Sequence, residues 1–373
     1  MSGVGGSGGE EVEMAGVVIG VLGPTGVGKT AVAVELARRM SESWLSPAAV
    51  ATVRGTRPGD GAAVGRGRVI SCDSMQVYQG FPVLTNQPVV DETEAVSHAL
   101  VGFVEPEGEF SAAQYAALAR PLVEEDLSSR GWALVVGGTG LYMRAALAPL
   151  AVAPGGDPEL RARLEARATA EGLDVLYGEL AALDPEAAGK IDPRNRRRVI
   201  RALEAISLTG RRWSGRDDLW TPAYYHPTLL IGLVAERKEL YRRIDLRAGQ
   251  MMRQGAVEEL QRFRQVRGLE ETRPGGPGIR SAIGYSEICR LLDGEQTLEE
   301  TVTQVAAATR RYARRQLTWL RKLGDAVIID VQDRNPGEVA QEILTLGRLG
   351  DHTRATARGS LITHEAGEVA GAG

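Results

Sequence analysis

The chain has 373 residues, of which 43% are hydrophobic and 25% charged, and its formal net charge is -4. This length can bury a large core and indicates more than one domain, or one domain with a large insertion. A net negative charge does not by itself suggest a nucleic-acid partner, so such a partner requires local basic clusters. The two cysteines, Cys72 and Cys289, lie far apart without CxxC spacing. They give no support for a disulfide framework or a structural zinc site, and they favour a reducing cytoplasm.

The two ends of the chain carry little apolar sequence. Residues 1–14 are rich in Gly, Ser and Glu, so we expect a disordered tail and not a signal peptide. Residues 336–373 are expected to form a C-terminal helix followed by a loose tail. No apolar run approaches the roughly 18 residues that a membrane-spanning helix needs, so no membrane partner is expected.

A phosphate-binding loop is predicted near the N-terminus, where the sequence fits G-x-x-x-x-G-K-[ST]. The loop follows the apolar run Val17–Leu22 and precedes the helical segment Ala31–Met40. Its glycines allow backbone N–H groups to face a phosphate, while the final Lys and Thr supply a cation and a ligand for Mg²⁺. We therefore expect these residues to bind a diphosphate: Gly23, Pro24, Thr25, Gly26, Val27, Gly28, Lys29 and Thr30. The alternative is a glycine-rich turn without a ligand.

Further apolar runs predict a doubly wound parallel sheet of the α/β class. They are 69–72, which ends at Asp73, 132–136, which ends at Gly137-Gly138-Thr139, and two later runs at 228–234 and 326–331. Ligands of open α/β sheets bind beyond the carboxyl ends of the strands. Asp73 and Thr139 should therefore point toward the phosphate loop.

Helical patterns surround these strands. Between Asp157 and Gly210 the leucines are spaced for a buried helical face, which predicts a helical insertion at 151–222 within a P-loop core at 15–150 and 223–335. The leucines of this predicted face are Leu160, Leu164, Leu173, Leu176, Leu180 and Leu183. Two more long helices are predicted at 236–266 and 301–323. Residues 41–67, rich in Gly, Ala, Pro and Arg, are interpreted as a flexible surface insertion.

Arginines concentrate in two places. The first cluster lies at 194–201, and the second, from Arg310 to Lys322, carries positive charges and no negative one. On a helix, Ala313, Leu317 and Leu320 would line one side of the second cluster. The arginines would then occupy the other faces, around Tyr312 and Trp319. Uncompensated positive charge favours contact with RNA phosphates, although arginine-rich helices can also be solvated faces.

Arg243 and Arg247 form a smaller pair. They lie four residues apart on one predicted helical face, where they could bind an anion such as the same diphosphate. Surface ion pairing is the alternative.

These residues together resemble the tRNA dimethylallyltransferase (tRNA isopentenyltransferase) family. The resemblance runs in order from about Val17 to Arg321. It rests on the phosphate loop, Asp73-Ser74-Met75-Gln76-Val77-Tyr78, Gly137-Gly138-Thr139-Gly140-Leu141-Tyr142, the segment 198–204, Arg243 and Arg247 with Met251 and Gly255, the segment 282–287 and the block 309–321. The segment Leu84-Thr85-Asn86-Gln87-Pro88 is closer to eukaryotic members, yet the cysteines of a eukaryotic zinc finger are missing.

The resemblance implies transfer of a dimethylallyl group from dimethylallyl diphosphate to N6 of the adenosine 3′-adjacent to the anticodon of tRNA. It makes Asp73 the candidate general base, with a Mg²⁺ ligand as its competing role. The expected catalytic set is Asp73, Lys29, Thr30, Thr139 and Arg247, with Mg²⁺ at Thr30. The expected tRNA contacts are Asp73, Ser74, Met75, Gln76, Arg197, Arg198, Arg201, Arg314 and Arg315. A monomer in the cytoplasm is expected.

Three other functions remain open from the sequence. An adenylate isopentenyltransferase would use the same chemistry on a free nucleotide, but it would not need RNA-gripping helices. A P-loop kinase or ATPase would need little beyond the loop and Asp73. A non-catalytic RNA-binding protein would not need an intact Lys29-Thr30 pair.

Overall fold

A six-stranded parallel sheet forms the centre of the protein. The structure is a computed structural model that describes residues 16–44, 67–88, 96–149, 157–214, 223–266 and 275–348. Neighbouring strands pair in the order β3-β2-β4-β1-β5-β6, and all pairs are parallel. The bounds are β1 Val17–Leu22, β2 Arg68–Cys72, β3 Ser97–Ala99, β4 Trp132–Gly137, β5 Thr228–Val234 and β6 Val327–Asp330. The predicted α/β fold is confirmed, and the runs at 69–72, 132–136, 228–234 and 326–331 correspond to four of the strands.

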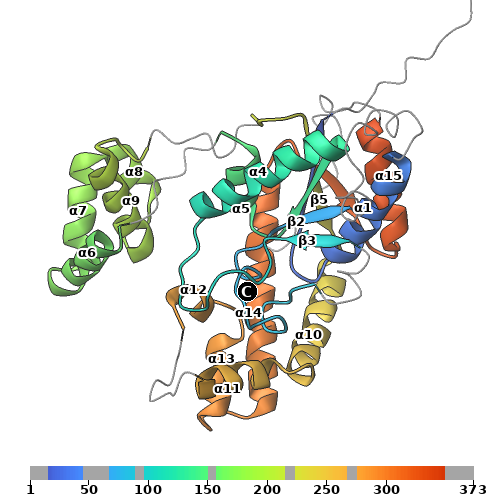
Figure 1. The fold of residues 1–373 in the computed structure, drawn as a ribbon. Coiled ribbons are helices and arrows are strands. Elements are labelled where there is room, and N and C mark those ends of the chain that lie inside the picture. Colours follow the sequence, from blue (N-terminus) through green and yellow to red (C-terminus); the bar gives the residue numbers. More distant parts are fainter. Residues whose placement is uncertain are drawn as a thin grey trace, which may run out of the picture.

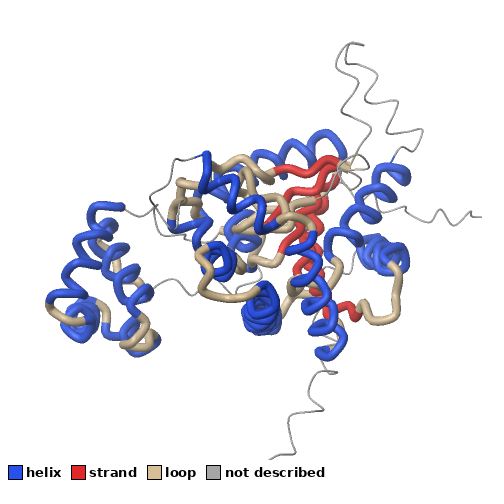
Figure 2. The backbone as a smooth tube through the Cα atoms, turned by 90° about the horizontal axis from the view of Figure 1, so that it is seen from below, coloured by secondary structure: helices blue, strands red, loops and turns tan. Residues whose placement is uncertain are grey.

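Helices cover both faces of this sheet (Figures 1 and 2). On one face, Val17, Ile19 and Val21 of β1 pack in a core with α1 (Lys29–Trp44) and α15 (Pro336–Arg348). On the other face, Val18 and Leu22 pack with α4 (Ala112–Arg130) and α5 (Gly140–Leu147). Because successive side chains of a strand point to opposite faces, a strand buried on both faces must be apolar throughout. This explains why β1 reads as a continuous apolar run.

β3 is the strand that the sequence did not reveal. It has only three residues, Ser97, His98 and Ala99, and it pairs with β2 at the edge of the sheet. Its residues are not fully buried, so the strand lacks the apolar run by which the others were recognised.

A second group of helices extends below the carboxyl edge of the sheet (Figure 1). These are α10 Arg237–Arg253, α11 Ala256–Val266, α12 Pro277–Arg280, α13 Tyr285–Leu292 and α14 Leu298–Lys322. The prediction of one helix over 236–266 is wrong, because Gly255 adopts a φ of 107° between α10 and α11. α14 begins three residues before its predicted start, where Thr297 and Glu300 form a capping box.

The predicted helical insertion is present as a separate lobe (Figures 1 and 2). It consists of α6 Pro158–Ala170, α7 Leu173–Leu183, α8 Pro185–Lys190 and α9 Arg196–Thr209, and it has its own apolar core. Leu164, Leu176 and Leu180 are buried there, and Leu160 and Leu173 pack against them. Leu183 was also expected on this face, but it ends α7 and is 51% exposed. The proposed domain limits stay an interpretation.

Some predictions fall partly or wholly outside the described residues. The terminal segments 1–15 and 349–373, and 45–66 of the predicted insertion, are among these. The start of that insertion is wrong, since Ser41–Trp44 continues α1. Among the described residues, no helix is both long and apolar enough to cross a membrane.

Candidate active site

The phosphate loop lies between the carboxyl end of β1 and the start of α1. Gly26 and Gly28 have φ angles of 84° and 97°, a region that disfavours other residues. Gly23 has no such φ, but a Cβ there would lie 2.9 Å from the Leu233 carbonyl oxygen of β5. The glycines therefore permit both the curvature of the loop and its close approach to the sheet.

Lys29 is folded back over its own loop. Its Nζ donates to the carbonyl oxygens of Gly23, at 3.0 Å, and Pro24, at 2.9 Å. Burial lowers the pKa of Lys29 to about 8, and the positive charge of Arg247 acts in the same direction. The negative charge of Asp73 raises this pKa. Phosphate oxygens would offer Lys29 stronger acceptors than the two carbonyls.

Asp73 and Thr139 follow the ends of β2 and β4, which are neighbours in the sheet. The Ser74 N–H donates to Thr139 Oγ1 at 3.3 Å, so the two strand ends are joined directly. The Met75 N–H donates to Asp73 Oδ1 at 2.8 Å. This contact fixes the orientation of the carboxylate and leaves Oδ2 to act on a ligand.

Helix α14 crosses this edge of the sheet and contributes three side chains that the sequence did not mark as functional. The Tyr312 hydroxyl lies in hydrogen-bonding contact with Thr139, and burial together with the charge of Asp73 raises its pKa. Trp319 packs so closely on α5 that a Cβ at Gly140 would lie 2.4 Å from its ring. Gln316 is 7% exposed and bonds both to the phosphate loop and to Gly138.

Helical spacing could have identified Gln316. It lies three residues after buried Ala313 and four before buried Leu320, so it belongs to the inward face of α14. Leu317, which was expected on that face, is partly buried against the core. A single glutamine among arginines is recognised as buried only when the residues are assigned to the faces of the helix.

The two arginines of α10 behave differently. Arg247 lies close enough to Lys29 to lower its pKa. Arg243 donates to Glu239 at 2.7 Å, as the surface ion-pairing alternative requires. The charge of Arg247 is therefore felt at the phosphate loop, and its catalytic role stays a prediction.

The second basic cluster lies on α14, beside the site. Arg311, Arg314, Arg315 and Arg321 are exposed. Arg314 donates to the Tyr241 hydroxyl at 3.4 Å, and Arg315 lies 5.6 Å from the centre of the Tyr312 ring. Arg310 is ion-paired with Asp245. Among the described residues, no ion pair joins those four exposed arginines to a carboxylate.

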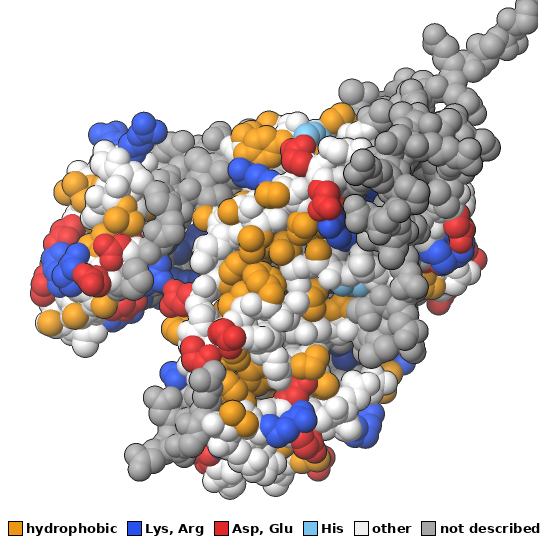
Figure 3. All heavy atoms as spheres, viewed as in Figure 1, with side chains coloured by type: hydrophobic (Ala, Val, Ile, Leu, Met, Phe, Trp, Pro, Cys, Tyr) orange, Lys and Arg blue, Asp and Glu red, His pale blue; other side chains and the backbone are white. Residues whose placement is uncertain are grey.

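The first basic cluster lies on and before α9 of the insertion lobe. Arg194, Arg196 and Arg201 are ion-paired with Asp192, Glu165 and Glu204, respectively. Arg197 and Arg198 are exposed. Figure 3 shows positive and negative side chains intermixed on this lobe.

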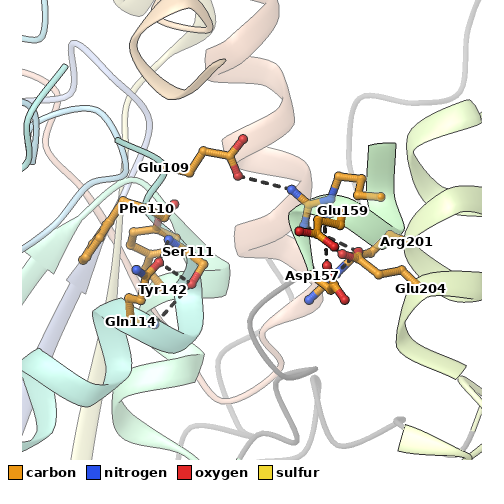
Figure 4. A network of polar contacts seen from close by, with 10 residues as sticks. Glu109, Phe110, Ser111, Gln114, Tyr142, Asp157, Glu159, Arg201 and Glu204 are labelled. Atoms are coloured by element: carbon orange, nitrogen blue, oxygen red, sulfur yellow. Dashed lines mark hydrogen bonds and ion pairs between the residues drawn. The ribbon is translucent and has the colours of Figure 1, made fainter. Parts of the chain in front are cut away.

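An ion-pair chain connects the lobe with the core. Arg161 of α6 donates to the buried Glu204 of α9 at 3.2 Å and to Glu109 of the core at 3.2 Å. Arg201 contacts the other oxygen of Glu204 at 2.7 Å. Figure 4 shows Glu109 on the core side and Arg201 with Glu204 on the lobe side. The expected RNA-binding residue Arg201 is therefore also part of the contact between the two regions.

Gln76 is partly exposed, and both ends of its amide are hydrogen-bonded to other residues of the protein. Its Oε1 accepts from Ser71 Oγ at 2.8 Å, and its Nε2 donates to the Asn86 carbonyl oxygen. Nearby, the backbone N–H groups of Val83 and Leu84 donate to Glu259 of α11. Gln76 thus orders the 81–87 turn, and its predicted tRNA contact stays a prediction.

The residues at the phosphate loop are compatible with a Mg²⁺ ion that is coordinated mainly by oxygens of the substrate. No group of three or more His, Cys, Asp or Glu that could hold a metal occurs in the described part of the chain. Mg²⁺ commonly uses few protein ligands together with phosphate oxygens and water. The partly exposed Thr30, in the first turn of α1, is placed for that kind of coordination.

The fold and the loop define a P-loop α/β protein with a carboxylate beside its phosphate site. Residues 76–323 match the family model described as IPP transferase. A tRNA dimethylallyltransferase of Bifidobacterium longum subsp. infantis is 37% identical over 356 residues, covering 94% of this chain and 98% of the relative. One of Thermomicrobium roseum is 38% identical over 315 residues, covering 84% and 86%.

Solved structures agree with this relationship. The tRNA isopentenylpyrophosphate transferase of Bacillus halodurans has a TM-score of 0.59 at 35% identity, covering 91% of this chain and 98% of its own. A eukaryotic dimethylallyltransferase described as acting on tRNA has a TM-score of 0.70 at 25% identity, covering 89% and 79%. The chain belongs to the IPP transferase family. The resemblance inferred from the motifs is confirmed.

Proposed function

We propose that the protein transfers a dimethylallyl group from dimethylallyl diphosphate to N6 of the adenosine that follows the anticodon of tRNA on its 3′ side. One observation carries the proposal beyond family membership: the phosphate loop, Asp73 and Thr139 meet at one edge of the sheet, beside the arginines of α14. A leaving-group site, a base and an RNA-facing surface are thereby adjacent.

In the reaction, a bond forms between N6 and C1 of the dimethylallyl group while the bond from C1 to the diphosphate oxygen breaks. The electron pair of that bond leaves with the diphosphate. Backbone N–H groups of the loop and Lys29 stabilise the charge that develops there. Bound Mg²⁺, held by Thr30 and diphosphate oxygens, would supply further stabilisation of the leaving group.

Asp73 accepts the proton of N6. An exocyclic aromatic amine is a weak nucleophile, so removal of its proton as the new bond forms lowers the barrier. Since Asp73 Oδ1 already accepts the Met75 N–H, Oδ2 is the oxygen that takes this proton. Thr139 and Tyr312 then serve to orient the adenine.

The tRNA enters from the side of α14. Arg311, Arg314 and Arg315 are exposed there and bind backbone phosphates in this proposal. The adenosine leaves its stack to reach Asp73, and Arg197, Arg198 and Arg201 of the lobe hold the flanking strand. The protein acts as a cytoplasmic monomer.

The test uses labelled dimethylallyl diphosphate and Mg²⁺ with two acceptors offered separately. One is an unmodified tRNA with adenosine beside its anticodon, and the other is AMP. We expect label on the tRNA at N6. Label on AMP alone, or ATP hydrolysis without any prenyl transfer, contradicts the proposal.

A further inference from the structure

Gln316 connects the two halves of the site. Its Oε1 accepts the Thr25 N–H of the phosphate loop at 2.8 Å, and its Nε2 donates to the Gly138 carbonyl oxygen at 3.0 Å. Thr25 holds the leaving-group side, whereas Gly138 precedes Thr139 on the side of the base. One amide therefore links the phosphate loop to the residue that precedes Thr139.

The contact between the Gln316 side chain and Gly138 is close and buried. Gln316 is 7% exposed, and a Cβ at Gly138 would lie 2.0 Å from its Nε2. Both polar atoms of the amide are used, so no other orientation of the side chain satisfies them in the same place. The Thr25 N–H is occupied by this bond, so the donors for the diphosphate must come from later residues of the loop.

Gln316 also lies directly beside the RNA-facing side chains. Arg315 precedes it, and Arg311 and Arg314 lie within two turns on the exposed faces of the same helix. A continuous helix is rigid over that length, so phosphates bound to the arginines restrain the position of Gln316. The restraint passes through one side chain to the phosphate loop.

We propose that Gln316 is a positioning residue that couples tRNA binding on α14 to diphosphate binding in the phosphate loop. This inference rests on the proposed function. Bound tRNA tightens the diphosphate site, and by reciprocity bound diphosphate tightens tRNA by the same factor. Without the amide, each ligand binds without effect on the other, and the reacting groups lose their alignment.

The experiment measures affinity for inorganic pyrophosphate with Mg²⁺ by calorimetry, with and without saturating tRNA. For the wild-type protein we expect tRNA to increase this affinity by at least about fivefold, within the usual range of coupling between sites. In Gln316→Met, which keeps the length of the side chain and removes both hydrogen bonds, the ratio should fall to about one. Single-turnover prenyl transfer should slow by roughly tenfold, since two hydrogen bonds are lost.

Gln304→Met is the matched control. Gln304 lies on the same helix, about 18 Å away, and its side chain bonds Arg290 outside the site. This variant should keep the wild-type ratio even if it melts at a lower temperature. A Gln316→Met protein that keeps the wild-type ratio, or a Gln304→Met protein that loses it equally, overturns the inference.

Gln316→Glu provides a second test if the methionine variant does not fold. It retains an acceptor for Thr25 and loses the donor to Gly138, so the coupling ratio should again decrease toward one. An unchanged ratio in this variant also overturns the inference. Failure of the proposed function is separately visible, because the wild-type protein would then leave tRNA unlabelled in the transfer assay.

Discussion

The two basic clusters look alike in the sequence and differ in their surroundings. On the insertion lobe, Arg194, Arg196 and Arg201 each pair with a carboxylate of the lobe itself. On α14, Arg314 and Arg315 contact tyrosines instead. An arginine already paired must break an ion pair before it binds phosphate. Arg315, over the Tyr312 ring, and Arg314, bonded to a neutral hydroxyl, keep their charges available.

A local excess of arginine therefore does not by itself identify an RNA-binding surface. The neighbouring carboxylates decide whether an arginine is available to phosphate: Glu165 of α6 holds Arg196, while Asp192 and Glu204 lie close in the sequence to Arg194 and Arg201. On this basis we expect Arg314 and Arg315 of α14 to contribute more to tRNA binding than the paired arginines Arg194, Arg196 and Arg201 of the lobe, whose ion pairs also support the lobe. Four predictions test this division of roles.

The largest effect is expected at the base. Asp73→Asn should lower single-turnover transfer by ~10²–10⁴-fold, because the amide cannot accept the N6 proton, while tRNA affinity stays near the wild-type value. Quenched-flow measurement at saturating tRNA checks the rate, and filter binding checks the affinity. Weakened tRNA binding with a normal rate would contradict this role.

A smaller effect, on stability, is expected in the lobe. Glu204 is fully buried and accepts from Arg161 and Arg201. Glu204→Gln should therefore destabilise the protein by about 2 kcal/mol, the range for hydrogen bonds to charged groups. Urea unfolding followed by circular dichroism measures it. Single-turnover transfer by the folded variant should be unchanged, and a slowed step would mean that the lobe takes part in the chemistry.

Activity should depend on the proton of Lys29. Its pKa is lowered to about 8, so its charge is present below that pH and is lost as pH rises through it. The kcat/KM for dimethylallyl diphosphate reports the free protein and should decline above pH 8, by up to about tenfold per pH unit. Lys29→Arg should not show this decline. Asp73→Asn should shift it to lower pH, because Asp73 raises the pKa of Lys29.

The smallest effect is expected on the salt dependence of tRNA binding, which compares the two basic clusters directly. Replacing Arg314 and Arg315 by Ala should reduce the slope of log affinity against log salt for tRNA binding by about 1.4–1.8, as expected for two lost phosphate contacts. Arg196→Ala, which removes an ion pair with Glu165, should leave the slope unchanged. Equal slopes for wild type and the double variant would show that α14 is a solvated face.

Much of the fold could be predicted because its signals are local. The strands β1, β2, β4 and β5 are apolar runs, and buried parallel strands need such runs. The phosphate loop was recognised because its backbone needs φ angles that favour glycine, and this need shows in the sequence. β3 and the break at Gly255 were missed, since neither differs clearly in composition from a loop or a helix.

The sequence by itself determined the loop, the order of the strands along the chain and the residues that follow their ends. It also determined the family, because its motifs occur in order over most of the chain. Only the tertiary structure decided which arginines are already paired, that Arg243 bonds Glu239 while the charge of Arg247 lowers the pKa of Lys29, and that Gln316 joins the loop to Gly138. The physical reason is that the bonds of Gln316 and the pair of Arg196 with Glu165 join residues far apart in the chain, of which local patterns carry no record. Local pairs such as Arg243 with Glu239 depend on which rotamers the packing of the helix leaves available.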